Sequence, residues 1–124
     1  MGDAAPLTPA MFHILLALAG GERHGYGIMS EIKATTGGAF QLGPGTLYRS
    51  INKLLALGMI EEAGERPDPE QDDERRRYYR ISAAGRRAAS AEAARLARLV
   101  SEARARRLLG DLGSEPAPGL GGAQ

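Results

Sequence analysis

The segment at residues 42–55 limits the possible folds of this chain more than any other. Gly43 can cap a helix, and Pro44 suits the first helical turn, where its missing N–H costs no hydrogen bond. Apolar residues then recur at the spacing of one helix face, namely Leu47, Ile51, Leu54 and Leu55. Gly58 is placed to end the helix. The pattern predicts a short helix with one face packed against a core.

The opposite face of this helix carries hydroxyl groups and cations, contributed by Thr46, Arg49, Ser50 and Lys53. Such side chains can contact base edges and phosphates in the major groove of DNA. Tyr48 flanks the same face, and its hydroxyl can reach a phosphate. An ordinary amphipathic helix at a protein surface would carry these groups only as solvated side chains. The neighbouring segments are needed to decide between the two interpretations.

Two more helices are predicted before this one. The first follows Thr8 and Pro9, and its residues 10–19 are apolar on nearly every side, so they must be buried on every side. Because a small domain would cover only one face, we expect a second chain to cover another. The next helix spans 25–36 and ends at two glycines. Its inward residues are Gly25, Ile28, Met29 and Ile32, and its outward residues are Tyr26, Ser30 and Lys33.

Two short strands are predicted after the third helix, at residues 59–66 and 75–81. The segment between them, 67–74, has the proline and acidic content of a solvated loop. Three helices followed by a hairpin is the element order of a winged helix-turn-helix. We therefore predict a mainly α fold with a small β-hairpin wing.

A long final helix is predicted from Ser82, its cap, to about residue 109, with a length of roughly 40 Å. One stripe of this helix is apolar and rich in alanine, formed by Ala89, Ala93, Leu96, Val100 and Ala103. Arginines occupy its other faces. A second helix could approach such a stripe closely. We predict a homodimer whose interface includes Phe12, Leu16, Leu96, Val100 and Ala103.

The 124 residues divide into a leader (1–7), a winged helix domain (8–81), a dimerisation helix (82–109) and a disordered tail (110–124). The net charge of +1 identifies no partner, but acidic residues dominate 61–74 and arginines dominate from 75 onward. The absence of cysteine excludes disulfides and thiolate metal sites. A signal peptide or membrane span is not recognisable, so we expect a cytoplasmic protein.

The two histidines do not indicate catalysis. His13 lies in the apolar first helix, where a hydrogen-bonded buried or interface role is the simpler interpretation. His24 precedes the second helix and is expected to pack at its first turn. Neither has the sequence neighbours of a catalytic triad or a metal site. We predict no enzymatic activity, no metal and no cofactor.

Four segments resemble the PadR-like transcriptional regulators, which are winged helix-turn-helix repressors. They read ILLALA at 14–19, HGYGI at 24–28, LGPGTLY at 42–48 and ERRRYYRI at 74–81. The resemblance covers about 8–109 and implies a homodimer that binds pseudo-palindromic operators in double-stranded DNA. It also implies release by a small effector in some members, which we expect to bind between the dimer helices. The chain lacks the tryptophan with which some short members stack flat aromatic drugs.

In a helix-turn-helix, the second helix of the pair enters the major groove while the first crosses the DNA backbone. The candidate DNA contacts are therefore Tyr26, Ser30, Lys33, Thr46, Tyr48, Arg49, Ser50 and Lys53. Arg75, Arg76 and Arg77 either hold phosphate or the minor groove, or pair with the acidic loop before them. The acidic wing leaves one alternative open, a winged-helix module that binds protein instead of DNA.

Overall fold

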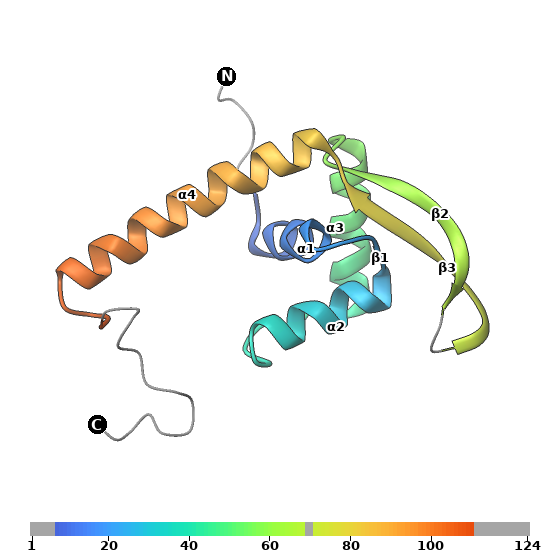
Figure 1. Cartoon of the computed structure of the whole chain (residues 1–124), viewed down its shortest axis with the longest axis horizontal. Helices are drawn as coiled ribbons and strands as arrows, with labels where there is room; N and C mark the ends of the chain where they lie inside the picture. The colour runs from blue at the N-terminus through green and yellow to red at the C-terminus, as the bar shows by residue number, and fades with distance from the viewer. Residues whose placement is uncertain (1–6, 69–70, 111–124) are drawn as a thin grey trace. The chain divides into compact units, whose positions relative to one another are not determined.

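The computed structural model describes residues 7–68 and 71–110, with the backbone alone for 68 and 71–75. The predicted leader and tail lie almost entirely outside the described residues. Two compact units, Met1–Glu92 and Ala93–Gln124, meet within the last helix. The elements of the described residues, labelled in Figure 1, are α1 (Pro9–Ala19), β1 (Arg23–His24), α2 (Gly25–Thr35), α3 (Pro44–Ala56), β2 (Ile60–Asp68), β3 (Gln71–Ile81) and α4 (Ala83–Ala105).

Helix α1 is the centre of the first unit and packs against α2, α3 and β3. The Thr8 side chain caps it by accepting a hydrogen bond from the Met11 N–H at 3.1 Å, which confirms the predicted start. Its buried residues are Met11, Ile14, Leu15, Ala17 and Leu18. They lie on one broad face of the helix, as expected for a small domain, and a second chain that covers the other face stays a prediction. Leu16 remains 45% exposed, and Phe12 is half-buried.

The two helices after α1 supply the rest of the core through the stripes that their spacing predicts. Helix α2 buries Gly25, Ile28 and Ile32, and α3 buries Leu47, Ile51 and Leu54. Gly58 ends α3 with a φ of 73°, a left-handed conformation that favours glycine. The N–H of Met59 then donates to the Leu54 carbonyl at 2.9 Å, which satisfies one carbonyl at the helix end.

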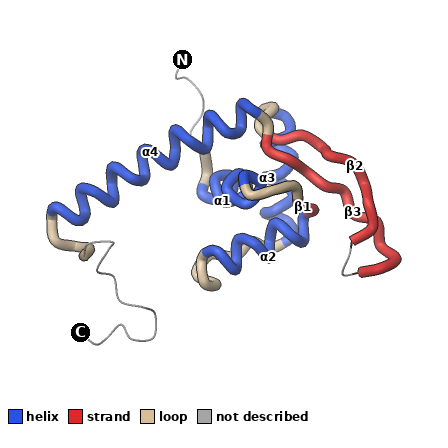
Figure 2. The backbone as a smooth tube through the Cα atoms, in the orientation of Figure 1, coloured by secondary structure: helices blue, strands red, loops and turns tan. Residues whose placement is uncertain are grey.

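The sheet is antiparallel, with the strand order β1-β3-β2. Figure 2 shows the long hairpin of β2 and β3 beside the helices. Both strands run farther than predicted, so much of the acidic segment 67–74 is strand instead of loop. The ladder pairs Pro67 with Arg75, and β2 lies at the sheet edge, where a missing N–H is tolerated. Strand β1 was not predicted, because two residues show no periodicity.

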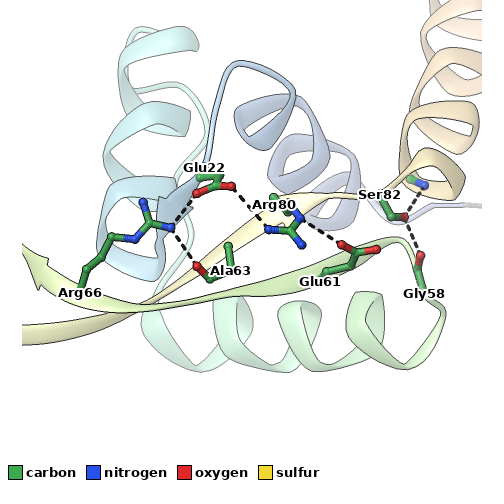
Figure 3. A network of polar contacts seen from close by, with 8 residues as sticks. Glu22, Gly58, Glu61, Ala63, Arg66, Arg80 and Ser82 are labelled. Atoms are coloured by element: carbon green, nitrogen blue, oxygen red, sulfur yellow. Dashed lines mark hydrogen bonds and ion pairs between the residues drawn. The ribbon is translucent and has the colours of Figure 1, made fainter.

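Helix α4 begins where the sequence predicts and ends earlier. The Ser82 hydroxyl accepts from the Gly85 N–H at 3.1 Å and donates to the Gly58 carbonyl at 2.6 Å (Figure 3). The helix stops at Ala105 instead of near residue 109, so its 23 residues span about 35 Å. Arg107 follows with a φ of 65°, and the Leu108 N–H donates to the Ala103 carbonyl at 2.9 Å. This hydrogen bond caps the C-terminal end of α4.

The apolar stripe of α4 is partly open in the single chain, with Ala93 and Val100 exposed. Leu99 is 53% exposed and Val100 is 40% exposed, while Leu96 and Ala103 are half-buried. Of the helices in the described part of the chain, none has the length and apolar character needed to cross a membrane.

Candidate nucleic-acid interface

The outward face of α3 carries the polar side chains that its spacing predicts. Thr46, Arg49 and Lys53 are exposed, and Ser50 is half-buried. A guanidinium nitrogen of Arg49, Nη2, donates to the Thr46 hydroxyl oxygen at 3.2 Å. Leu47, one of the buried residues of α3, anchors the opposite side of the helix in the core. Helix α3 thus combines a buried apolar face with an opposite face of hydroxyls and cations that is accessible to a ligand.

Tyr48 joins α3 to the start of α2. Its hydroxyl and ring pack directly on Gly25, so closely that a Cβ at this position would overlap them. At Gly27, in the same turn, an added Cβ would meet the His24 ring at an ordinary 3.5 Å. Gly25 therefore serves as the flat surface on which the Tyr48 ring lies. The sequence pattern placed Gly25 inward but gave no indication of this partner.

The outward face of α2 is also exposed, with Tyr26, Ser30 and Lys33 all accessible. His24 holds the first turn of this helix, since its Nδ1 accepts from the Gly27 N–H at 3.0 Å. The ring is buried and lies nearly perpendicular to the Tyr78 ring, with the two centroids 5.1 Å apart. The predicted packing role of His24 is confirmed, and an accepting Nδ1 requires the ring proton on Nε2.

The predicted wing arginines lie in different surroundings. Arg77 is exposed and pairs with two carboxylates of β2, at 3.7 Å from Glu62 and 3.6 Å from Glu65. Arg76 is half-buried, and the side chain of Arg75 lies outside the described residues. Of the two predicted roles, the structure favours charge pairing for Arg77 in the free protein. Its partners belong to the neighbouring strand and not to the loop that the sequence indicated.

A polar groove of about 370 Å³ lies between the helices and the hairpin. Tyr48 and Asn52 of α3 line one side, and Glu65, Arg76 and Arg77 line the other. The sequence pattern did not single out Asn52, which lies on α3 beside the outward face. Its amide could have drawn attention, because asparagine is a common reader of adenine. The groove places the wing charges next to α3.

A second polar network ties the hairpin to the turn before β1 (Figure 3). Glu22 accepts from Arg66 at 2.6 Å and pairs with Arg80 at 3.6 Å, and Arg80 donates to Glu61 at 3.0 Å. The hydrogen bond from Arg66 is the main cause of the lowered pKa of Glu22. The Arg66 guanidinium also covers the Tyr78 ring, 4.0 Å from its centroid. This network fixes the base of the wing.

His13 lies among aromatic rings at the surface of α1. Its ring stacks on Phe40, with the centroids 4.2 Å apart and the planes at 21°, and Phe12 lies edge-on at 6.1 Å. Partial burial lowers the pKa of His13. The sequence predicts a hydrogen-bonded buried or interface histidine, whereas in the structure the ring is half-buried and held by stacking on Phe40.

Three helices, a short strand and a hairpin, with Tyr48 and Asn52 of α3 lining a groove together with the hairpin, define a winged helix-turn-helix protein. The predicted fold class is confirmed. The family model of the PadR-like transcriptional regulators matches residues 14–91, and the chain belongs to this family.

Several solved structures share the fold. A transcriptional regulator from Clostridium thermocellum has a TM-score of 0.62 and 24% identity, over 77% of this chain and 89% of that one. A PadR family regulator from Clostridium difficile has a TM-score of 0.64 and 18% identity, over 82% and 100%. Bacillus subtilis PadR in complex with operator DNA has a TM-score of 0.53 and 23% identity, over 62% and 42%. At these identities the likeness shows the fold alone.

A curated relative is more similar in sequence. A 37.1 kDa protein of the transposon TN4556 from Streptomyces fradiae is 36% identical over 90 residues, which are 73% of this chain. The match spans 24% of that protein, so the chain corresponds to about a quarter of its length.

Proposed function

We propose that this chain is a sequence-specific DNA-binding regulator that represses transcription as a homodimer on a pseudo-palindromic operator. The observation that carries the proposal is the face of Thr46, Arg49 and Lys53, exposed on a helix whose other side is anchored in the core. The operator complex of Bacillus subtilis PadR, a protein with the same fold, supports DNA as the ligand.

In this proposal α3 enters the major groove, where Thr46, Arg49, Ser50 and Lys53 contact bases and nearby phosphates. Tyr26, Ser30 and Lys33 of α2 and the Tyr48 hydroxyl contact phosphates, which position the protein without reading sequence. The wing arginines 75–77 would hold phosphates of the flanking DNA or enter its adjacent minor groove. The half-buried Ser50 is the least accessible member of the set.

The dimer forms through the terminal helix and the open part of α1. Leu99 and Val100 leave an exposed apolar surface on α4, which Leu96 and Ala103 extend. Phe12 and Leu16 add apolar surface on α1. An effector would bind between the dimer helices and would not be a flat polyaromatic molecule, because α4 contains no aromatic side chain to stack on it.

One observation favours the alternative module that binds protein, namely that Glu62 and Glu65 neutralise the exposed Arg77. A salt titration of binding to a random duplex distinguishes the two functions. A regulator that neutralises several phosphates loses affinity steeply as salt rises, with a log–log slope of about −0.9 for each phosphate. Absence of duplex binding at low salt by a folded dimer would refute DNA recognition and leave the protein-binding alternative.

A further inference from the structure

Arg77 is held by two carboxylates at the place where the hairpin faces α3. Its Nη1 lies 3.7 Å from a carboxylate oxygen of Glu62, and its Nη2 lies 3.6 Å from one of Glu65. Each of the three side chains is about half exposed. The strand register places Glu65 opposite Arg77 and Glu62 opposite Tyr79, so all of them share one face of the hairpin. We call Glu62, Glu65 and Arg77 the wing triad.

The wing triad lies beside the proposed DNA-binding face. Glu65 and Arg77 line the groove that Tyr48 and Asn52 of α3 also line. In the proposed complex, a duplex bound by α3 would bring its phosphates to this groove, where the cation would attract them and the carboxylates would repel them. The carboxylates therefore compete with phosphate for the same guanidinium.

We propose that Glu62 and Glu65 determine the specificity of DNA recognition by withholding Arg77 from the phosphates of non-operator DNA. The inference rests on the proposed function. An exposed ion pair contributes little stability, so Arg77 can leave it when α3 fits its operator and holds a phosphate within reach. On other sequences the fit is looser, and Arg77 stays with the carboxylates.

The effect on specificity follows from the origin of non-specific affinity. Binding to random DNA comes almost entirely from phosphate contacts, so withholding one cation lowers it directly. The operator complex also has base contacts, which hold the backbone close enough to compete for Arg77. Because specificity is a difference between two affinities, weakening the wrong complex increases it.

The opposite face of the hairpin provides a matched control. Glu61 lies next to Glu62 in β2, and its carboxylate accepts from Arg80 at 3.0 Å. Arg80 pairs with Glu22 as well (Figure 3), and neither residue lines the groove. Replacing Glu61 with glutamine removes one negative charge from the same strand, half of what the removal of Glu62 and Glu65 together takes away, without freeing Arg77.

The test compares the wild-type protein with the double variant Glu62→Gln, Glu65→Gln on random duplex and on an operator selected by the wild-type protein. We expect the double variant to bind random duplex about three- to tenfold more tightly, with a salt slope steeper by about one. Operator affinity should rise less, so the ratio of the two affinities falls. Glu61→Gln should leave that ratio unchanged.

The same substitutions are then made in an Arg77→Ala background, where we expect most of the gain to disappear. A gain that persists without Arg77, or that is equal on both duplexes, would mean that the carboxylates act by general repulsion and would overturn the inference. Suppose that the wild-type protein binds DNA and that the double variant folds but has the same affinity for random duplex as the wild type. This result would overturn the inference about Glu62 and Glu65 and leave the proposed function standing. Failure of the wild-type protein to bind any duplex would refute the proposed function instead.

Discussion

Gly25 shows how one residue can couple the two helices of the proposed recognition unit. The Tyr48 ring lies on its backbone, and the Cα has no room for a side chain. His24, the preceding residue, caps the same helix turn through its Nδ1. The packing of α3 against α2 therefore depends on the contact between Tyr48 and the HGYGI segment at residues 24–28.

Replacing Gly25 with alanine should destabilise the fold by about 1–3 kcal/mol, because the new Cβ overpacks against Tyr48. The matched control is Gly27→Ala, where space is available and helix propensity favours alanine by up to about 1 kcal/mol. Urea denaturation at neutral pH measures both. Adding Tyr48→Phe, which removes the hydroxyl nearest to the new Cβ, should restore part of the stability. Equal stability of the two alanine variants would contradict this packing.

His13 should make the stability of the fold depend on pH just below neutrality. Burial lowers the pKa of the folded-state imidazole, so the unfolded chain, with an ordinary value of about 6.5, binds the proton more readily. Its contribution is complete above pH 6.5 and is lost as the pH falls through the folded-state pKa. In His13→Phe, which retains an aromatic ring against Phe40, this dependence should disappear. The free energies of unfolding of the wild type and of His13→Phe are measured between pH 7.5 and 5.5. If both change with pH in the same way, the predicted role of His13 is wrong.

At the scale of elements, periodicity predicts α2 and α3 well because each buries one stripe. The starts of α1 and α4 follow from capping hydroxyls, Thr8 and Ser82, which are visible in the sequence. The strands are harder, since β1 has two residues and β3 extends through charged residues of low strand propensity. In β3, hydrogen bonding to β2 overrides the low strand propensity of the charged residues, and a pattern within one segment does not show this pairing.

The same distinction applies to the candidate interface. The outward faces of α2 and α3 follow from helical spacing alone, and the structure exposes Lys33, Arg49 and Lys53 as expected. The partners of Arg77 do not follow, because the register of the hairpin contains an irregularity between Glu62 and Glu65. Spacing within one strand carries no information about which residue of the next strand lies opposite.

For the whole molecule, the exposed apolar residues of α4 favour association of two chains into a dimer. The open apolar surface of α4 is larger than a single exposed side chain, since Leu99 and Val100 lie next to each other on it. Helix α1 supports the proposed dimer less strongly than α4, because Leu16 is exposed but Phe12 is half-buried. The terminal helix is therefore the main support for a dimer.

Val100→Asp should weaken the dimer by placing an unpaired charge in its interface, raising the dissociation constant by tenfold or more, about 1.4 kcal/mol. The control Ala94→Asp adds the same charge at an exposed position on the other side of α4. Sedimentation equilibrium at micromolar concentrations measures both. A wild-type chain that remains monomeric, or a Val100→Asp variant that associates as well as Ala94→Asp, would contradict the proposed interface.

The central claim, that α3 reads DNA sequence, is tested most directly by comparing Arg49→Ala with Lys33→Ala. An operator is first selected from random duplex by the wild-type dimer, and anisotropy then measures binding to it and to its single-base variants over a range of salt. Arg49→Ala should cost on the order of 1–3 kcal/mol per half-site and relax the preference at one base position.

Lys33→Ala should weaken binding to all duplexes alike and reduce the salt slope by about one for each phosphate that the lysine neutralises in the wild-type complex. Both side chains are exposed, so neither change should alter folding. If a folded, dimeric Arg49→Ala protein kept the affinity and the sequence preference of the wild type, the assignment of α3 as the recognition helix would be wrong.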